Sequence, residues 1–162
     1  MAKREDRNAL RFVPLHLRVD VCLHPDYWAD DVRAAIEDEL SDGHTIPKLG
    51  LGTWMIDDDV VAQAVRDAVE IGYRHIDTAA AYGNEHGVGQ AIRESAIPRH
   101  QLYVTTKLDN SDQGHARHAL EDSLAALGLD YVDLYLIHWP VPRANKFVQA
   151  WRALEQAQAD AE

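Results

Sequence analysis

The chain has 162 residues, and its 16 lysines and arginines against 27 aspartates and glutamates give a formal net charge of −11 at pH 7. A charge of this sign disfavours nucleic acids and anionic membrane surfaces as general partners. Apolar residues make up 46% of the chain, enough for a packed core, and a single cysteine, Cys22, excludes an internal disulfide framework. No apolar run approaches the roughly 20 residues that span a bilayer. Residues 1–11 carry too many charges for a secretory signal, so we expect a soluble, cytoplasmic protein.

The first forty residues are patterned differently from the rest of the chain. Apolar and polar residues alternate over Leu15–Cys22, with the two-residue period of a half-buried strand. An apolar stripe over Ala29–Leu40 predicts a short helix, and Ser41–His44 has the composition of a junction. We therefore expect residues 1–43 to form a strand–loop–helix extension in front of a separate domain over residues 44–162.

Beyond the junction, apolar runs typical of strands alternate with amphipathic runs typical of helices. The predicted strands are Leu49–Trp54, His75–Ala80, Leu102–Leu108 and Val132–His138, and the predicted helices are Asp58–Ile71, Glu85–Ser95, His115–Leu127 and Phe147–Ala159. Gly72 and Gly128 follow two of these helices as stop signals. The alternation indicates an α/β fold of about four βα units, in which right-handed crossovers join parallel strands.

Four polar side chains stand where the predicted strands end. In a parallel sheet, functional groups collect at the carboxyl ends of the strands and in the loops that follow them. Asp77, Lys107 and His138 end three successive strands, and Tyr82 lies in the loop after the first of these. Each alone has an ordinary structural interpretation, such as a turn cap or a solvated cation. A carboxylate, an ammonium, a phenol and an imidazole on one rim are harder to explain by packing.

These four groups suit one kind of chemistry. An ammonium beside a phenol favours the phenolate, and a carboxylate beside the ammonium keeps the ammonium charged and oriented. An imidazole can donate a hydrogen bond to a carbonyl oxygen. Together, such groups would protonate and polarise a carbonyl whose carbon receives a hydride. Because no side chain supplies a hydride, this reaction requires a cofactor.

Five blocks around these positions resemble the aldo-keto reductases, in particular the bacterial branch that includes 2,5-diketo-D-gluconate reductases. The blocks are Ile46–Trp54, Gly72–Ala79, Tyr82–Glu85, Thr105–Leu108 and Asp133–Pro140. The resemblance implies a catalytic tetrad of Asp77, Tyr82, Lys107 and His138. Tyr82 would be the general acid in reduction, Lys107 its activating partner and Asp77 the residue paired with Lys107. His138 would orient the carbonyl group of the substrate.

The resemblance also implies a cofactor and a substrate pocket. Thr53 and Asp77 would lie near the nicotinamide ribose of NADPH. Trp54 and Trp139 would form walls of a pocket for a small carbonyl substrate, although core or rim packing explains two tryptophans equally well. His115 and His118 lie about one turn apart on a predicted helix, but no third ligand is evident, so we expect no metal site.

The family fold is an eight-stranded β/α barrel of about 250 residues, whereas four βα units are predicted here. We therefore expect a partial (β/α)8 TIM barrel, without the later strands that hold the cofactor phosphates in the family. Open sheet edges would invite self-association, and the extension over residues 1–43 could cover an edge or the open face. Three functions remain open: an NADPH-dependent reductase of aldehydes and ketones, an inactive truncated relative, and an interaction module that uses the extension or an open edge.

Overall fold

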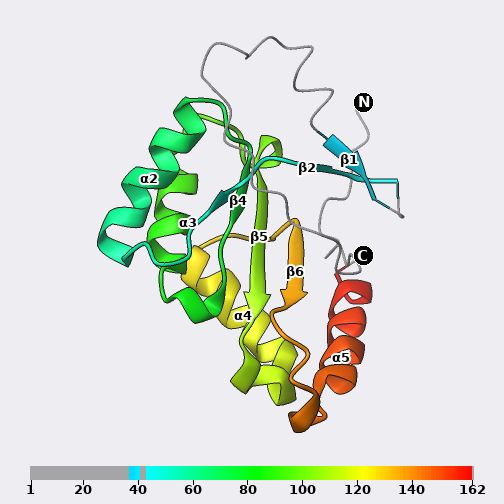
Figure 1. Ribbon diagram of the computed structural model, residues 1–162. Helices are drawn as coiled ribbons and strands as arrows, with labels where there is room; N and C mark the ends of the chain where they lie inside the picture. Colours follow the sequence, from blue (N-terminus) through cyan, green and yellow to red (C-terminus); the bar gives the residue numbers. More distant parts are fainter. Residues whose placement is uncertain (1–36, 41–42, 162) are drawn as a thin grey trace.

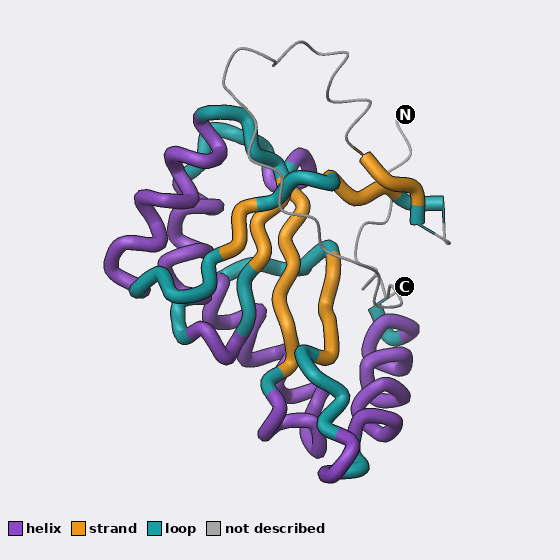
Figure 2. Tube along the Cα trace, in the orientation of Figure 1, coloured by secondary structure: helices purple, strands orange, loops and turns teal. Residues whose placement is uncertain are grey.

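The computed structural model describes residues 37–40 and 43–161. They form a four-stranded sheet with helices around its outer side, together with a two-stranded hairpin (Figures 1 and 2). The predicted strand at Leu15–Cys22 and most of the predicted helix at Ala29–Leu40 lie outside the described residues. None of the described helices is both long enough and apolar enough to cross a membrane.

The four-stranded sheet takes its strands in chain order, and all neighbours are parallel. The strands are β3 (Leu51–Gly52), β4 (His75–Asp77), β5 (Tyr103–Leu108) and β6 (Leu134–Ile137). Each lies inside its predicted range but is shorter, because the chain leaves the sheet to build the loops at the strand ends. After β4, for example, Ala80–Tyr82 forms a short 3₁₀ turn, η2. The prediction of a parallel α/β sheet is confirmed.

Four helices connect and flank these strands. They are α2 (Asp58–Glu70), α3 (Glu85–Glu94), α4 (Ala116–Leu127) and α5 (Phe147–Ala159), each within one residue of its predicted bounds. Gly72 and Gly128 have φ angles of 108° and 61° just after α2 and α4. Glycine adopts this left-handed backbone without a steric penalty, so both predicted stop signals act as expected.

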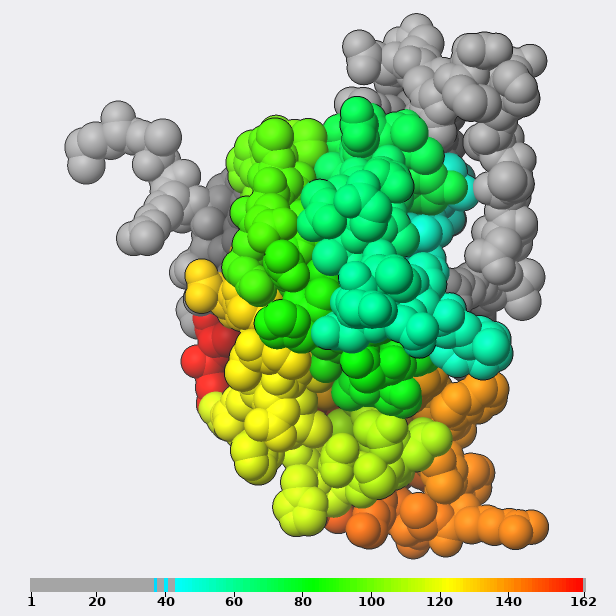
Figure 3. Space-filling view, turned by 90° about the vertical axis from the view of Figure 1, so that its left-hand side faces the viewer, coloured from blue at the N-terminus to red at the C-terminus, as the bar shows by residue number. Residues whose placement is uncertain are grey.

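The core lies between the sheet and its helices, and Figure 3 looks onto this helical layer. Side chains alternate along β5: Val104 and Leu108 are fully buried in the core, whereas Tyr103 and Lys107 belong to the opposite row. The helices pack closely enough that a β-carbon on Gly89 of α3 would collide with the backbone at the end of α4. The alternation gives the sheet one face that holds the fold together and another that carries polar groups.

The helix predicted over Ala29–Leu40 is wrong at its C-terminal end. Glu37–Glu39 forms strand β1, which pairs antiparallel with β2 (Thr45–Pro47). Gly43, at the turn between them, has a φ angle of 79°. The Asp-Gly dipeptide at residues 42–43 is a hairpin signal that outweighs the helical stripe before it. The division after residue 43 stays a prediction, but the hairpin pairs strands from both sides of it.

A histidine connects the hairpin to the main sheet. In His75 of β4, Nδ1 lies 3.1 Å from the carbonyl oxygen of Pro47, and Nε2 lies 2.9 Å from the hydroxyl of Thr105 in β5. Because a carbonyl oxygen can only accept, Nδ1 carries a proton and donates it to Pro47. This contact ties β2 to the amino end of β4.

Candidate active site

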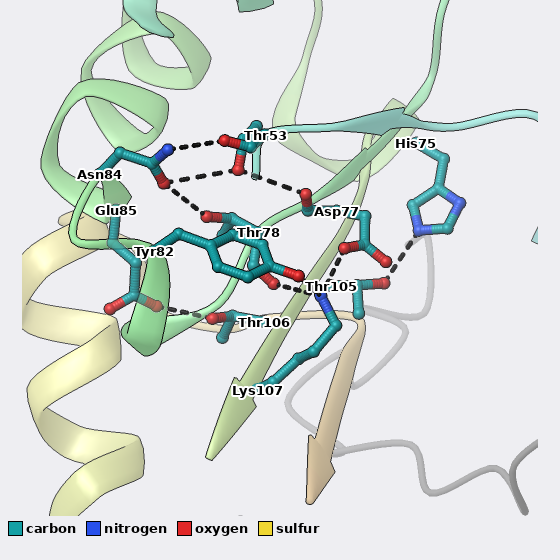
Figure 4. Close-up of polar contacts among 10 residues, drawn as sticks. All are labelled: Thr53, His75, Asp77, Thr78, Tyr82, Asn84, Glu85, Thr105, Thr106 and Lys107. Atoms are coloured by element: carbon teal, nitrogen blue, oxygen red, sulfur yellow. Dashed lines mark hydrogen bonds and ion pairs between the residues drawn. The ribbon is translucent and has the colours of Figure 1, made fainter. Parts of the chain in front are cut away.

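Lys107, near the carboxyl end of β5, is the centre of a buried polar cluster (Figure 4). Its side chain is 9% exposed, and that of Asp77, to which its ammonium donates, is 13% exposed. The same Nζ donates to the carbonyl oxygen of Thr78 at 2.8 Å and to the phenol oxygen of Tyr82 at 3.2 Å. Three acceptors therefore match the three N–H donors of the ammonium.

Strand register explains how these groups meet. Asp77 of β4 pairs with Thr105 of β5, and Lys107 lies two residues further along the same row of side chains. The chain then turns through η2, and Gly83 ends this turn with a φ angle of 68°. The turn brings Tyr82 back over Lys107, whose Nζ lies 4.9 Å from the centre of the phenol ring.

His138 completes the cluster from the residue directly after β6. Its ring lies beside that of Tyr82, with 5.6 Å between the ring centres. Burial and, second, the ammonium of Lys107 lower the pKa of His138 below its ordinary value. The imidazole is therefore neutral at pH 7 and can donate from one nitrogen. The structure brings the four predicted side chains together, and their catalytic roles stay predictions.

Both predicted pocket tryptophans are exposed, and each directly follows a residue that contacts the cluster or belongs to it, Thr53 and His138 respectively. Trp54, in the loop after β3, is 68% exposed, and Trp139 is 63% exposed. The ring of Trp139 stacks on that of His138 with 6.3 Å between centres. Exposure of this extent argues against core packing, whereas packing at the rim stays open as the alternative interpretation. A role of either residue in substrate binding stays a prediction.

Thr53 is placed differently from the other predicted residues. It is fully buried, and its hydroxyl lies 3.3 Å from the carbonyl oxygen of Asp77 and 3.4 Å from Oδ1 of Asn84. Its side chain is thus directed into the protein, where it holds two loops together. Contact between Thr53 and a nicotinamide ribose stays a prediction.

Two neighbouring residues bear on the site although the sequence assigned them no role. Asn84 precedes α3 at a position typical of a helix cap, but its side chain makes no cap bond and turns towards the site loops instead. Glu85 is buried, and its carboxylate accepts from the hydroxyl of Thr106 at 2.6 Å. Burial raises the pKa of Glu85. Thr106 directly precedes Lys107 in β5, so the two side chains point to opposite faces of the strand. Glu85 therefore contacts β5 on the face that the helices cover.

A carboxylate, an ammonium, a phenol and a neutral imidazole at neighbouring strand ends define a candidate site for proton transfer to a carbonyl oxygen. Residues 48–160 match the sequence model described as the Aldo/keto reductase family. The chain belongs to this family.

In each of the following matches, the aligned region covers less than half of the relative's own length. Methylglyoxal reductase DkgA of Escherichia coli (strain K12) is 49% identical over 122 residues, which are 75% of this chain and 44% of that protein. The crystal structure of an aldo/keto reductase from Brucella melitensis matches with a TM-score of 0.73 and 50% identity, over 76% of this chain and 49% of that one. A Bombyx mori aldo-keto reductase, crystallised in complex with NADP, matches with a TM-score of 0.70 and 42% identity, over 76% and 46% of the two chains.

The chain thus spans about half the length of the relatives that it matches. Its sheet of four parallel strands corresponds to part of a β/α barrel that is not closed. The predicted partial barrel is confirmed.

Proposed function

We propose that this chain carries the proton-transfer site for NADPH-dependent reduction of aldehydes or ketones to alcohols. The observation that supports this most directly is the contact between the phenol of Tyr82 and the ammonium of Lys107, which itself lies against Asp77. The name of the relative DkgA, a methylglyoxal reductase, suggests a small dicarbonyl as the first substrate to test.

The proton moves from Tyr82. When bound, NADPH supplies a hydride to the carbonyl carbon of the substrate. The phenol of Tyr82 gives its proton to the carbonyl oxygen, and the ammonium of Lys107 stabilises the phenolate that remains. Asp77 holds this ammonium in place and keeps it charged.

His138 and the tryptophans act on the substrate rather than on the proton. The neutral imidazole of His138 donates a hydrogen bond to the carbonyl oxygen and so orients it towards Tyr82. Trp54 and Trp139 place apolar surface around the substrate and exclude water from it.

The chemistry of the donor set fits the reacting end of the cofactor. The phenol and the imidazole both serve a carbonyl oxygen, and neither they nor any other side chain can supply the hydride. Asp77, and the backbone at Thr53 in the loop after β3, would lie near the nicotinamide ribose. In β/α barrels the phosphate-binding loops frequently follow strands 7 and 8. The four units of this chain therefore account for the nicotinamide end of the site rather than for the phosphates.

Replacement of the phenol tests this proposal. Tyr82→Phe keeps the ring but removes the proton, so methylglyoxal-dependent NADPH oxidation should fall by about 10²–10⁴-fold. Binding of NADPH, followed by its fluorescence, should be unchanged. Tyr131→Phe is the matched control, because the ring of Tyr131 packs against Arg99 away from the cluster. Wild-type protein without saturable NADPH oxidation, or full activity in Tyr82→Phe, would contradict the proposal.

A further inference from the structure

Asn84 carries a buried carboxamide that forms hydrogen bonds to two site loops (Figure 4). The residue is 1% exposed. Its Nδ2 donates to the carbonyl oxygens of Thr53 at 2.8 Å and Ile56 at 2.7 Å. Its Oδ1 accepts from the hydroxyl of Thr78 at 3.0 Å and lies 3.4 Å from that of Thr53. Both N–H donors are therefore matched and the oxygen accepts from Thr78, a combination of donor and acceptor that an amide side chain provides.

The two donors hold a strained loop at both ends. Thr53 and Ile56 flank Trp54 and Met55, and Met55 has a φ angle of 62°. For a residue with a side chain, this left-handed backbone is unfavourable and persists only where the surroundings enforce it. The loop has one turn bond of its own, from the Ile56 amide to the Thr53 carbonyl at 3.2 Å. The Thr53 amide donates to the carbonyl oxygen of Asp77 at 3.0 Å, and the two bonds from Asn84 add a second restraint on the loop that carries Trp54.

The acceptor oxygen of Asn84, Oδ1, restrains the segment after β4 that contacts Lys107. Thr78 donates to Asn84 through its hydroxyl, and its carbonyl oxygen accepts from Lys107 at 2.8 Å. Asn84 also lies two residues after Tyr82. One carboxamide therefore fixes the backbone that carries the phenol and the backbone that receives the ammonium.

We propose that Asn84 is a positioning residue of this site: its carboxamide sets the contact between Tyr82 and Lys107 and presents Trp54 to the substrate. The consequence for catalysis rests on the proposed function. The geometric part concerns the folded chain itself and is measurable without turnover.

Asn84→Asp is the sharpest perturbation, because it keeps the size of the side chain and its acceptor oxygen. It replaces the donor group by an oxygen that faces the carbonyls of Thr53 and Ile56, so two attractive contacts become repulsive. The matched control is Asp133→Asn, which is equally conservative and disturbs the contact with Arg99, 2.7 Å long, before the start of β6.

Nuclear magnetic resonance of the full chain reads the geometry directly. In the wild type, cross-relaxation should connect the ring protons of Tyr82 with the side chain of Lys107, and the backbone coupling of Met55 should report a positive φ. In Asn84→Asp, the cross-relaxation between Tyr82 and Lys107 should be lost and the coupling of Met55 should no longer report a positive φ. In Asp133→Asn, both observations should match the wild type. If Asn84→Asp folds and keeps both, the proposal is wrong.

A milder variant covers the case in which Asn84→Asp does not fold. Thr78→Val removes a single donor to Asn84 and retains the shape of the side chain. It should weaken the signal between Tyr82 and Lys107 and leave the coupling of Met55 unchanged. An unchanged signal between Tyr82 and Lys107 would count against the positioning role.

Kinetics separate this proposal from the proposed function. Where the wild type reduces methylglyoxal, Asn84→Asp should lower kcat by about 10²-fold, the effect of a displacement of about 1 Å, with little change in NADPH binding. Unchanged kcat would overturn the inference. A wild type without turnover would contradict the proposed function, whereas the resonance measurements would still decide the role of Asn84.

Discussion

Removal of one partner of the ion pair at the centre of the site should strongly destabilise the fold, because the other charge would then be buried alone. Lys107→Met removes the ammonium and keeps most of the aliphatic side chain, so the carboxylate of Asp77 loses the cation that neutralises it. The variant also removes hydrogen-bond donors from the carbonyl of Thr78 and the phenol of Tyr82. The carboxylate would have to reorganise or take up a proton.

The structure sets the size of this effect. With the side chains of Lys107 and Asp77 only 9% and 13% exposed, solvent screens the pair weakly. Removal of one partner of a buried pair typically costs about 3–5 kcal/mol. That is a large share of the 5–15 kcal/mol by which domains are usually stable. The double variant Lys107→Met/Asp77→Asn removes both charges and should be more stable than Lys107→Met alone.

Urea unfolding of the wild type, both single variants and the double variant measures the coupling between the two residues. The expected cycle shows a coupling energy well above the 0.2–1 kcal/mol of exposed pairs. A loss below about 1 kcal/mol for Lys107→Met, or no recovery in the double variant, would refute the argument that this pair is buried and mutually dependent.

Two further predictions concern the helical face of the sheet. Burial raises the pKa of Glu85 above its ordinary 4.5, so the folded state binds this proton more tightly than the unfolded chain and loses stability as the pH rises through the folded pKa. Glu85→Gln should therefore be more stable than the wild type at neutral pH, with a gain that shrinks in acid; a gain independent of pH in urea unfolding would disprove this. Gly89→Ala should destabilise the fold by about 1–3 kcal/mol despite the better helix propensity of alanine, because its β-carbon meets the backbone of Leu127. Gly114→Ala, whose β-carbon would approach only the side chain of Lys146 at 3.4 Å, should change the unfolding midpoint little.

The helices could be predicted closely because their signals are local. The bounds of α5 agree with the prediction at both ends, and glycines mark the ends of α2 and α4. The same local signal failed at Glu37–Glu39, where an apolar stripe suggested a helix and pairing with β2 produced a strand. The hairpin depends on a turn and on a partner strand, which the periodicity of a single segment does not report.

The residues of the candidate site also fall into two groups: those that a local pattern could locate and those that depend on contacts distant in sequence. Strand ends located Asp77, Lys107 and His138, because the carboxyl ends of parallel strands share one rim. The direction of the Thr53 side chain and the role of Asn84 depend on a contact between residues 31 positions apart. Such contacts follow from the packing of loops, and a polar residue before a helix is more simply interpreted as a cap.

The hairpin of β1 and β2 also affects where the protein can be shortened. A start at residue 44 would delete β1 and leave β2, still tethered through Pro47 to His75, with an exposed row of amide and carbonyl groups. Such a row is a template on which other chains can add strands. A boundary that looks like a linker in the sequence is thus the turn of a hairpin, and a chain cut there would expose the edge of β2 to pairing with other chains.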